Sequence, residues 1–104
     1  MATPPIVDSS ALIQGTEGLI TIFTLVEHPD AERYAQRVLF PSQTDYAQAI
    51  RLSRRLQKIG LGVGAIDLLI ASMAINRNLA VATRDRDFEK IQAVEKNLKI
   101  EWIQ

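Results

Sequence analysis

The chain has 104 residues, of which 47% are apolar and 23% charged, so it fits one globular domain with a single core. Lys and Arg together number twelve, as do Asp and Glu, so no overall basicity points to nucleic acid. The absence of cysteine excludes disulfides, thiolate metal sites and cysteine nucleophiles. No signal-peptide pattern and no apolar run long enough to span a membrane is present. We therefore expect a cytoplasmic protein with one domain over residues 1–104.

The first predicted strand ends at Asp8, and Ser9 or Ser10 can cap the helix that follows. Open α/β sheets place their ligand sites at the carboxyl ends of strands. Asp8 is therefore either a cap or a site residue. A second acid, Glu27, closes the apolar run 19–26, which is either a strand or a strand passing into a helix. Pro29 then begins a predicted helix that extends to residue 37.

A predicted strand at residues 38–40 ends before Pro41, and Ser42 to Asp45 has the spacing of a capping box. The helix that this box opens extends to about Ile59. One of its faces is apolar, with Ala49, Leu52, Leu56 and Ile59. Another face is basic, and we call it the basic ridge: Arg51, Arg54, Arg55 and Lys58. Four cations at this spacing form either a solvated helix face or a surface for a phosphate backbone.

Three glycines, at positions 60, 62 and 64, precede a largely apolar segment that carries Asp67. Glycine permits a sharp turn or a positive φ, and the spacing of the apolar residues that follow predicts a buried helix. These residues are Ile66, Leu69, Ile70 and Met73. Asp67 falls in the first turn of this helix, where the helix dipole favours an acid. A purely stabilising role for Asp67 is therefore one possibility and a role in a site is the other.

The last part of the chain predicts a buried strand at residues 79–83, a short helix at 88–92 and a final strand at 98–103. The segment after the buried strand alternates arginine and aspartate from Arg84 to Asp87. The two arginines either neutralise the acids as surface ion pairs or are available for a ligand. The order of strands and helices predicts an α/β fold, with helices around a mostly parallel sheet.

Acids thus stand at the edges of four elements, and parallel strands would bring several of them together. Crowded carboxylates do not all ionise cheaply unless a cation lies between them. Oxygen ligands without cysteine favour Mg²⁺ or Mn²⁺ over Zn²⁺, and such sites commonly serve phosphoryl chemistry. Ser10 and Thr83 are placed to orient a carboxylate or a water through hydrogen bonds.

The segments around these acids resemble the successive acidic motifs of PIN-domain nucleases, and most closely those of VapC toxins from toxin–antitoxin systems. The segments are 7–13, 24–27, 64–71 and 82–88. The resemblance implies a three-layer α/β/α fold and a Mg²⁺- or Mn²⁺-dependent endoribonuclease, commonly homodimeric and inhibited by a VapB antitoxin. It makes Asp8, Glu27, Asp67 and Asp85 the metal-binding acids, with Asp87 as a fifth. Arg51, Arg54, Arg55, Arg84 and Arg86 would then be available for the RNA backbone.

Only eighteen residues separate Asp8 from Glu27, whereas the family usually carries longer helices there. The resemblance therefore also allows a different class, a shortened PIN scaffold without catalysis that binds protein or RNA. A third class, the aspartate-nucleophile phosphatases of the haloacid-dehalogenase type, generally needs an aspartate two residues after the first one. That position is Ser10 here, which disfavours the third class.

Overall fold

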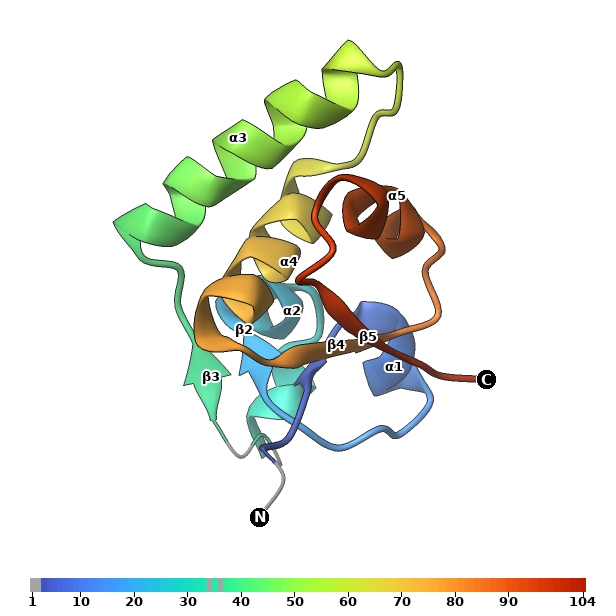
Figure 1. Ribbon diagram of the computed structural model, residues 1–104. Coiled ribbons are helices and arrows are strands. Elements are labelled where there is room, and N and C mark those ends of the chain that lie inside the picture. Colours follow the sequence, from blue (N-terminus) through green and yellow to red (C-terminus); the bar gives the residue numbers. More distant parts are fainter. Residues whose placement is uncertain (1–2, 34, 36) are drawn as a thin grey trace.

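The computed structural model describes residues 3–33, 35 and 37–104, and it shows helices packed around short parallel strands (Figure 1). The elements in chain order are β1 (Ile6–Val7), α1 (Ser9–Ile13), β2 (Ile20–Thr21), α2 (Ile22–Glu27), a 3₁₀ helix η1 (Pro29–Arg33), β3 (Val38–Leu39), α3 (Gln43–Lys58), α4 (Ala65–Arg77), β4 (Ala80–Thr83), α5 (Asp87–Val94) and β5 (Lys99–Trp102). In the described part of the chain, no helix has the length and apolar character that crossing a membrane requires.

The strands form two parallel sheets, one with the order β1-β4-β5 and the other with β2-β3. A bridge between Ile6 and Leu19 joins them, with the Val7 amide donating to the Leu19 carbonyl at 2.7 Å. The strands therefore follow one another across the molecule as β3, β2, β1, β4 and β5. This arrangement confirms the predicted parallel α/β fold and puts the carboxyl ends of β1, β4 and β5 at one edge.

Side chains of successive strand residues point to opposite faces, so the sheet separates two apolar layers. Ile6 and Val81 pack in the larger layer with residues of α3, α4 and α5. Val7 and Ala82 pack in the smaller layer with residues of α1 and η1. In Figure 1, α5 lies above β4 and β5. The fold is thus the predicted three-layer α/β/α arrangement.

The long helix α3 begins with the predicted capping box. The Ser42 amide donates to Asp45 Oδ2 at 2.7 Å, and the Asp45 amide donates to Ser42 Oγ at 3.3 Å. Asp45 also accepts hydrogen bonds from Asn76 and Arg77 at the end of α4, although it is fully buried. The capping acid of one helix therefore also fixes the end of the next, because a buried carboxylate needs a paired cation.

Several details differ from the sequence expectations. The helix after Pro29 is a 3₁₀ turn that ends at Arg33, and the rest of the predicted helix includes Tyr34 and Gln36, which lie outside the described residues. The prediction that Ile59 belongs to the buried face of α3 was wrong, because the chain leaves the helix there and Ile59 is 57% exposed. Of the apolar residues predicted for the buried helix α4, Ile66 is also exposed, whereas Ile70 and Met73 are buried as predicted.

Candidate metal centre

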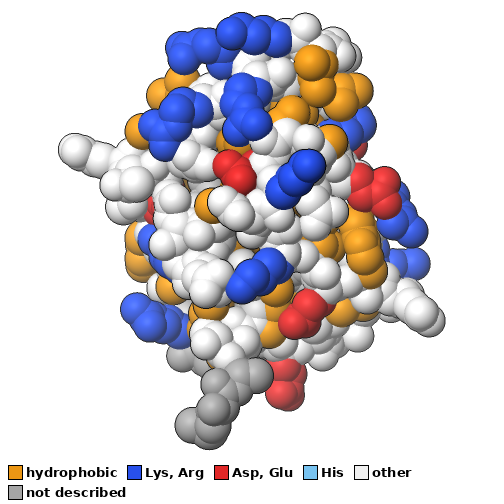
Figure 2. Space-filling view, viewed as in Figure 1, with side chains coloured by type: hydrophobic (Ala, Val, Ile, Leu, Met, Phe, Trp, Pro, Cys, Tyr) orange, Lys and Arg blue, Asp and Glu red, His pale blue; other side chains and the backbone are white. Residues whose placement is uncertain are grey.

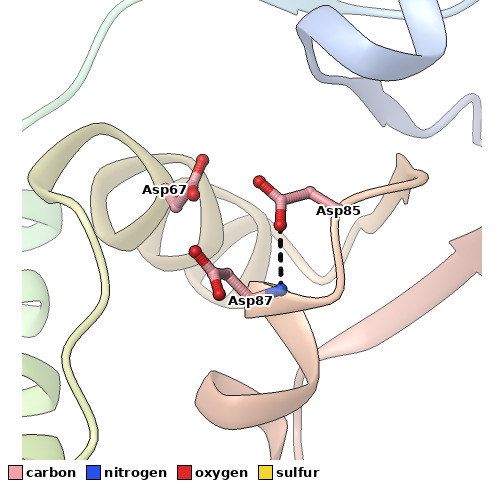
Figure 3. Close-up of side chains that lie close together, drawn as sticks. All are labelled: Asp67, Asp85 and Asp87. Atoms are coloured by element: carbon pink, nitrogen blue, oxygen red, sulfur yellow. Dashed lines mark hydrogen bonds between the residues drawn. The ribbon is translucent and has the colours of Figure 1, made fainter.

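Three aspartates offer carboxylate oxygens that all lie within 4.8 Å of one another: Asp67, Asp85 and Asp87. We call them the acid cluster. Asp67 comes from the first turn of α4, Asp85 from the turn after β4, and Asp87 is the first residue of α5. Figure 3 shows the three carboxylates facing one another, with the Asp87 amide donating to Asp85 Oδ1 at 2.9 Å. Asp67 therefore meets two acids that lie 18 and 20 positions later in the sequence.

The Asp67 carboxyl group has a strongly raised pKa. Burial, followed by the charges of Asp85, Asp8, Asp87 and Glu27, raises its pKa from the usual 3.8 to about 6. The other four acids singled out in the sequence therefore all act on the Asp67 carboxyl group. A group of like charges that cannot ionise freely is the electrostatic condition under which a bound cation is favoured.

Asp8 lies beside the acid cluster but is not one of the three acids that meet. Its Oδ1 accepts hydrogen bonds from Ser10 Oγ at 2.8 Å and from the Ala11 amide at 3.0 Å. Its Oδ2 accepts a hydrogen bond from Thr83 Oγ1. Asp8 thus caps α1, and at the same time it is held by the two hydroxyl groups that were predicted to orient a carboxylate.

The same two hydroxyl groups position the turn that carries Asp85. Ser10 Oγ accepts from the Arg84 amide at 2.9 Å, and Thr83 Oγ1 accepts from the Asp85 amide at 2.9 Å. Since Ser10 follows β1 and Thr83 ends β4, these bonds connect the ends of two neighbouring strands. A network of hydroxyls and amides therefore fixes Asp8 and Asp85 relative to each other.

Glu27 is the last residue of α2 and is exposed. Its Oε1 accepts a hydrogen bond from Ser9 Oγ at 3.0 Å, so the start of α1 holds it. Glu27 lies outside the acid cluster but is close enough for its charge to raise the pKa of Asp67. The contact with Ser9 was not predicted, since no sequence pattern links a serine after one strand to an acid 18 residues later.

The arginines near the acids do not neutralise them. Within the described residues, neither Arg84 nor Arg86 forms an ion pair with Asp85 or Asp87, and Arg86 pairs with Glu89 instead. The surface-pair interpretation of this segment was therefore wrong, because α5 begins at Asp87 and turns Arg86 toward the side chain three residues later. Asp87 does have one cation nearby, Lys90, at 3.0 Å.

The basic ridge lies on α3, and Figure 2 shows Lys and Arg side chains gathered at the top of the molecule over this helix. Arg55 differs from the others because it donates to the Val94 carbonyl and lies 3.8 Å from Glu95, at the far end of α5 from Asp87. Arg51 donates to Gln48 on its own helix, and Arg54 is exposed. An RNA-binding role for these arginines stays a prediction.

The donor set of the acid cluster fits a hard divalent cation. All three groups are carboxylates, the chain has no cysteine, and its one histidine is His28 at the end of α2. Carboxylate oxygens suit Mg²⁺ and Mn²⁺, whereas Zn²⁺ sites generally use nitrogen or sulfur ligands. The raised pKa of Asp67 supports the fit, because a cation would stabilise the ionised form of all three acids.

Three solved structures illustrate what the fold is similar to. One is DNA-bound VapBC from Salmonella typhimurium, with 21% identity, 97% of this chain and 98% of that chain covered, and a TM-score of 0.79. VapBC-5 from Mycobacterium tuberculosis has 23% identity, 99% coverage of both chains and a TM-score of 0.72. FitAcB from Neisseria gonorrhoeae has 16% identity, coverage of 92% and 95%, and a TM-score of 0.71.

At these levels of identity the structural likeness shows the fold alone, and no curated protein matches the chain by sequence. The family itself is shown by a sequence match to the PIN domain over residues 22–94, which is more than half of the chain and includes four of the five acids. The chain belongs to the PIN domain family.

Proposed function

We propose that the protein is a Mg²⁺- or Mn²⁺-dependent endoribonuclease of the VapC type, which hydrolyses RNA phosphodiester bonds. The observation that carries the proposal is the acid cluster. Burial and the charges of four other acids raise the pKa of Asp67, one of its members, to about 6. A divalent cation bound there would lower the pKa of a coordinated water and neutralise charge on the scissile phosphate.

The residues divide into three roles under this proposal. Asp67 and Asp85 hold the cation, with Asp87 beside them, and Asp8 and Glu27 complete the negative field. Ser10 and Thr83 keep Asp8 and the Asp85 turn in place through their hydrogen bonds. The arginines predicted to contact RNA hold its backbone: Arg51, Arg54, Arg55, Arg84 and Arg86.

We also propose that the protein is a toxin that pairs with a VapB-like antitoxin and forms a homodimer. The support for the antitoxin pairing is the fold, because the similar Mycobacterium tuberculosis structure is described as a member of the VapBC family of toxin–antitoxin systems. Co-purification of the chain with the product of a neighbouring small gene would test the pairing. Loss of RNA cleavage on adding that product would test the inhibition.

The test of the enzymatic proposal compares the wild-type protein with Asp67→Asn and with Asp30→Asn. Asp30 is an exposed acid of η1 outside the acid cluster, so it controls for the loss of one surface charge. We expect the wild type and Asp30→Asn to cleave a labelled RNA when Mg²⁺ or Mn²⁺ is present, and we expect EDTA to stop this cleavage. Asp67→Asn should remain folded and inactive. Undiminished cleavage by Asp67→Asn would refute the proposed role of the acid cluster.

Calorimetric titration with Mn²⁺ separates the enzyme from a scaffold without catalysis. The proposed enzyme binds Mn²⁺ at the acid cluster, and Asp85→Asn weakens that binding. A wild-type protein that neither binds Mn²⁺ nor cleaves RNA would instead be a binding module on a shortened PIN scaffold. The short helices α1 and α2, with five and six residues, are the feature that makes this comparison necessary.

A further inference from the structure

Trp102 and Arg86 form a contact that includes none of the acids and hydroxyl groups of the site. The guanidinium carbon of Arg86 lies 4.4 Å from the centre of the Trp102 ring, which is the geometry of a cation–π contact. Trp102 is the only tryptophan of the chain and remains 37% exposed. The Arg86 side chain is 72% exposed. A large aromatic ring and a planar cation are therefore stacked where solvent reaches them.

The sheet register places this pair at the same edge as the acid cluster. Trp102 is paired with Thr83 in the parallel β4–β5 ladder, and Thr83 is the residue that holds both Asp8 and the Asp85 turn. Neighbouring strands lie about 5 Å apart, so the Trp102 backbone is one strand away from this anchor. Arg86 is close to the acid cluster as well, because it stands between Asp85 and Asp87 in the chain.

The ring also lies on the face of the sheet where α5 begins. Ile100 packs against the apolar layer that contains α3, α4 and α5, and side chains two residues apart on a strand share a face. Trp102 therefore points to that same face, beyond the point where the apolar layer covers it. Its contact with Arg86, directly before α5, agrees with this placement.

We propose that Trp102 and Arg86 form a stacking platform for an unpaired base of the RNA substrate, next to the acid cluster. This inference rests on the proposed ribonuclease function and deepens it by naming two residues that would bind a base of the RNA. A base stacks on an aromatic ring or on a guanidinium plane only when it is free of its own helix, so the platform selects single-stranded RNA or loops over duplex. Every base has a flat face, so the platform discriminates weakly between sequences.

The single tryptophan makes the platform directly observable. Binding of a short single-stranded RNA in EDTA, where cleavage is prevented, should quench the Trp102 fluorescence in a saturable way. An abasic oligonucleotide of the same length keeps the phosphates but has no base to stack, so it should produce little quenching at equal charge. Equal quenching by both oligonucleotides, or none by either, would overturn the platform without any substitution in the protein.

Variants then measure what the stack contributes to cleavage. We expect Trp102→Leu to raise KM for single-stranded RNA about 5- to 100-fold with kcat nearly unchanged, the range that loss of one base–aromatic stack produces. Trp102→Phe should retain most of the affinity because it keeps an aromatic face. Arg86→Lys should lose part of it, since lysine keeps the charge but not the plane. Unchanged KM in a folded Trp102→Leu protein would refute the platform.

Failure of the platform and failure of the proposed function give different results. RNA cleavage that continues unchanged in Trp102→Leu, without quenching by RNA in the wild type, removes the platform and leaves the nuclease. Base-dependent quenching by a wild-type protein that does not cleave RNA supports the platform and removes the nuclease. In that case the chain is an RNA-binding module that recognises unpaired bases.

Discussion

Replacing Asp67 with asparagine should make the metal-free protein more stable, although it removes the proposed catalytic acid. In the folded chain the pKa of Asp67 is about 6, because burial and the charges of four other acids oppose its ionisation. Asparagine has nearly the same shape and no charge. The substitution therefore relieves repulsion that the folded state bears and the unfolded chain does not.

The size of the effect follows from the pKa difference. A pKa of about 6 against the usual 3.8 corresponds to roughly 3 kcal/mol at neutral pH, at about 1.4 kcal/mol for each unit. Asp67 is only partly buried, so solvent screening reduces the expected gain to about 1–2 kcal/mol. For a domain of this size, each kcal/mol raises the melting temperature by about 4–8 °C.

The pH dependence identifies the cause of the gain. Between pH 3.8 and about 6 the folded state binds more protons than the unfolded chain, so wild-type stability falls as the pH rises through this window. In EDTA, the wild type and Asp67→Asn should therefore have the same melting temperature near pH 4. The difference between the two melting temperatures should then increase up to about pH 7. A difference that does not change with pH, or a less stable variant at pH 7, would refute the electrostatic reasoning.

Three further predictions concern the metal and the fold. Mn²⁺ should raise the melting temperature of the wild type but not of Asp67→Asn, because a ligand stabilises only the state that binds it. Equal shifts of the two melting temperatures in differential scanning fluorimetry would contradict the acid cluster as the Mn²⁺ site. Arg77→Met should cost about 3–5 kcal/mol in urea denaturation at pH 7, since it leaves the fully buried Asp45 charge unpaired. Burial alone would raise the pKa of Asp45, but hydrogen bonds from Arg77, Ser42 and Asn76 outweigh burial and lower this pKa to about 2. The ionised Asp45 therefore stabilises the fold above pH 3.8, and this stability is lost as the pH falls through about 2. Gly18→Ala should destabilise by about 1–3 kcal/mol because the new Cβ would lie 2.5 Å from the Pro5 carbonyl oxygen, whereas Gly62→Ala, with nothing within 4 Å, should not.

The parallel sheet and the elements that carry the acids were predictable from local patterns. A short apolar run that is followed by an acid predicts a strand with a candidate site residue near its end. This describes Asp8, directly after β1, and Asp85, two residues after β4. The capping box before α3 was visible for the same reason, because its two partners are three residues apart. The residues that produce each of these patterns lie within one helical turn or one strand, so the sequence shows them directly.

The contacts that assemble the site were less accessible because they join distant segments. The pairing of Arg77 with Asp45 and the stacking of Arg86 on Trp102 depend on how α3, α4 and β5 pack. Arg86 was singled out for its charge, but no sequence pattern predicted that its guanidinium would stack on an aromatic residue sixteen positions later. The same limit explains why the sequence did not distinguish the three acids whose carboxylates meet from Asp8 and Glu27, which lie outside that cluster.

Asp8 shows that a cap and a site residue need not be alternatives. A carboxylate has about four acceptor positions, and here Ser10, the Ala11 amide and Thr83 use three of them. Two of these bonds fall on Oδ1 and one on Oδ2, so the remaining position lies on Oδ2, the oxygen that Thr83 holds. Thr83 also fixes the Asp85 turn, so the free position of Asp8 and the acid cluster are oriented by one hydroxyl group. The capping bonds therefore fix the Asp8 carboxylate beside the acid cluster, so a helix cap also contributes its charge to the negative field of the site.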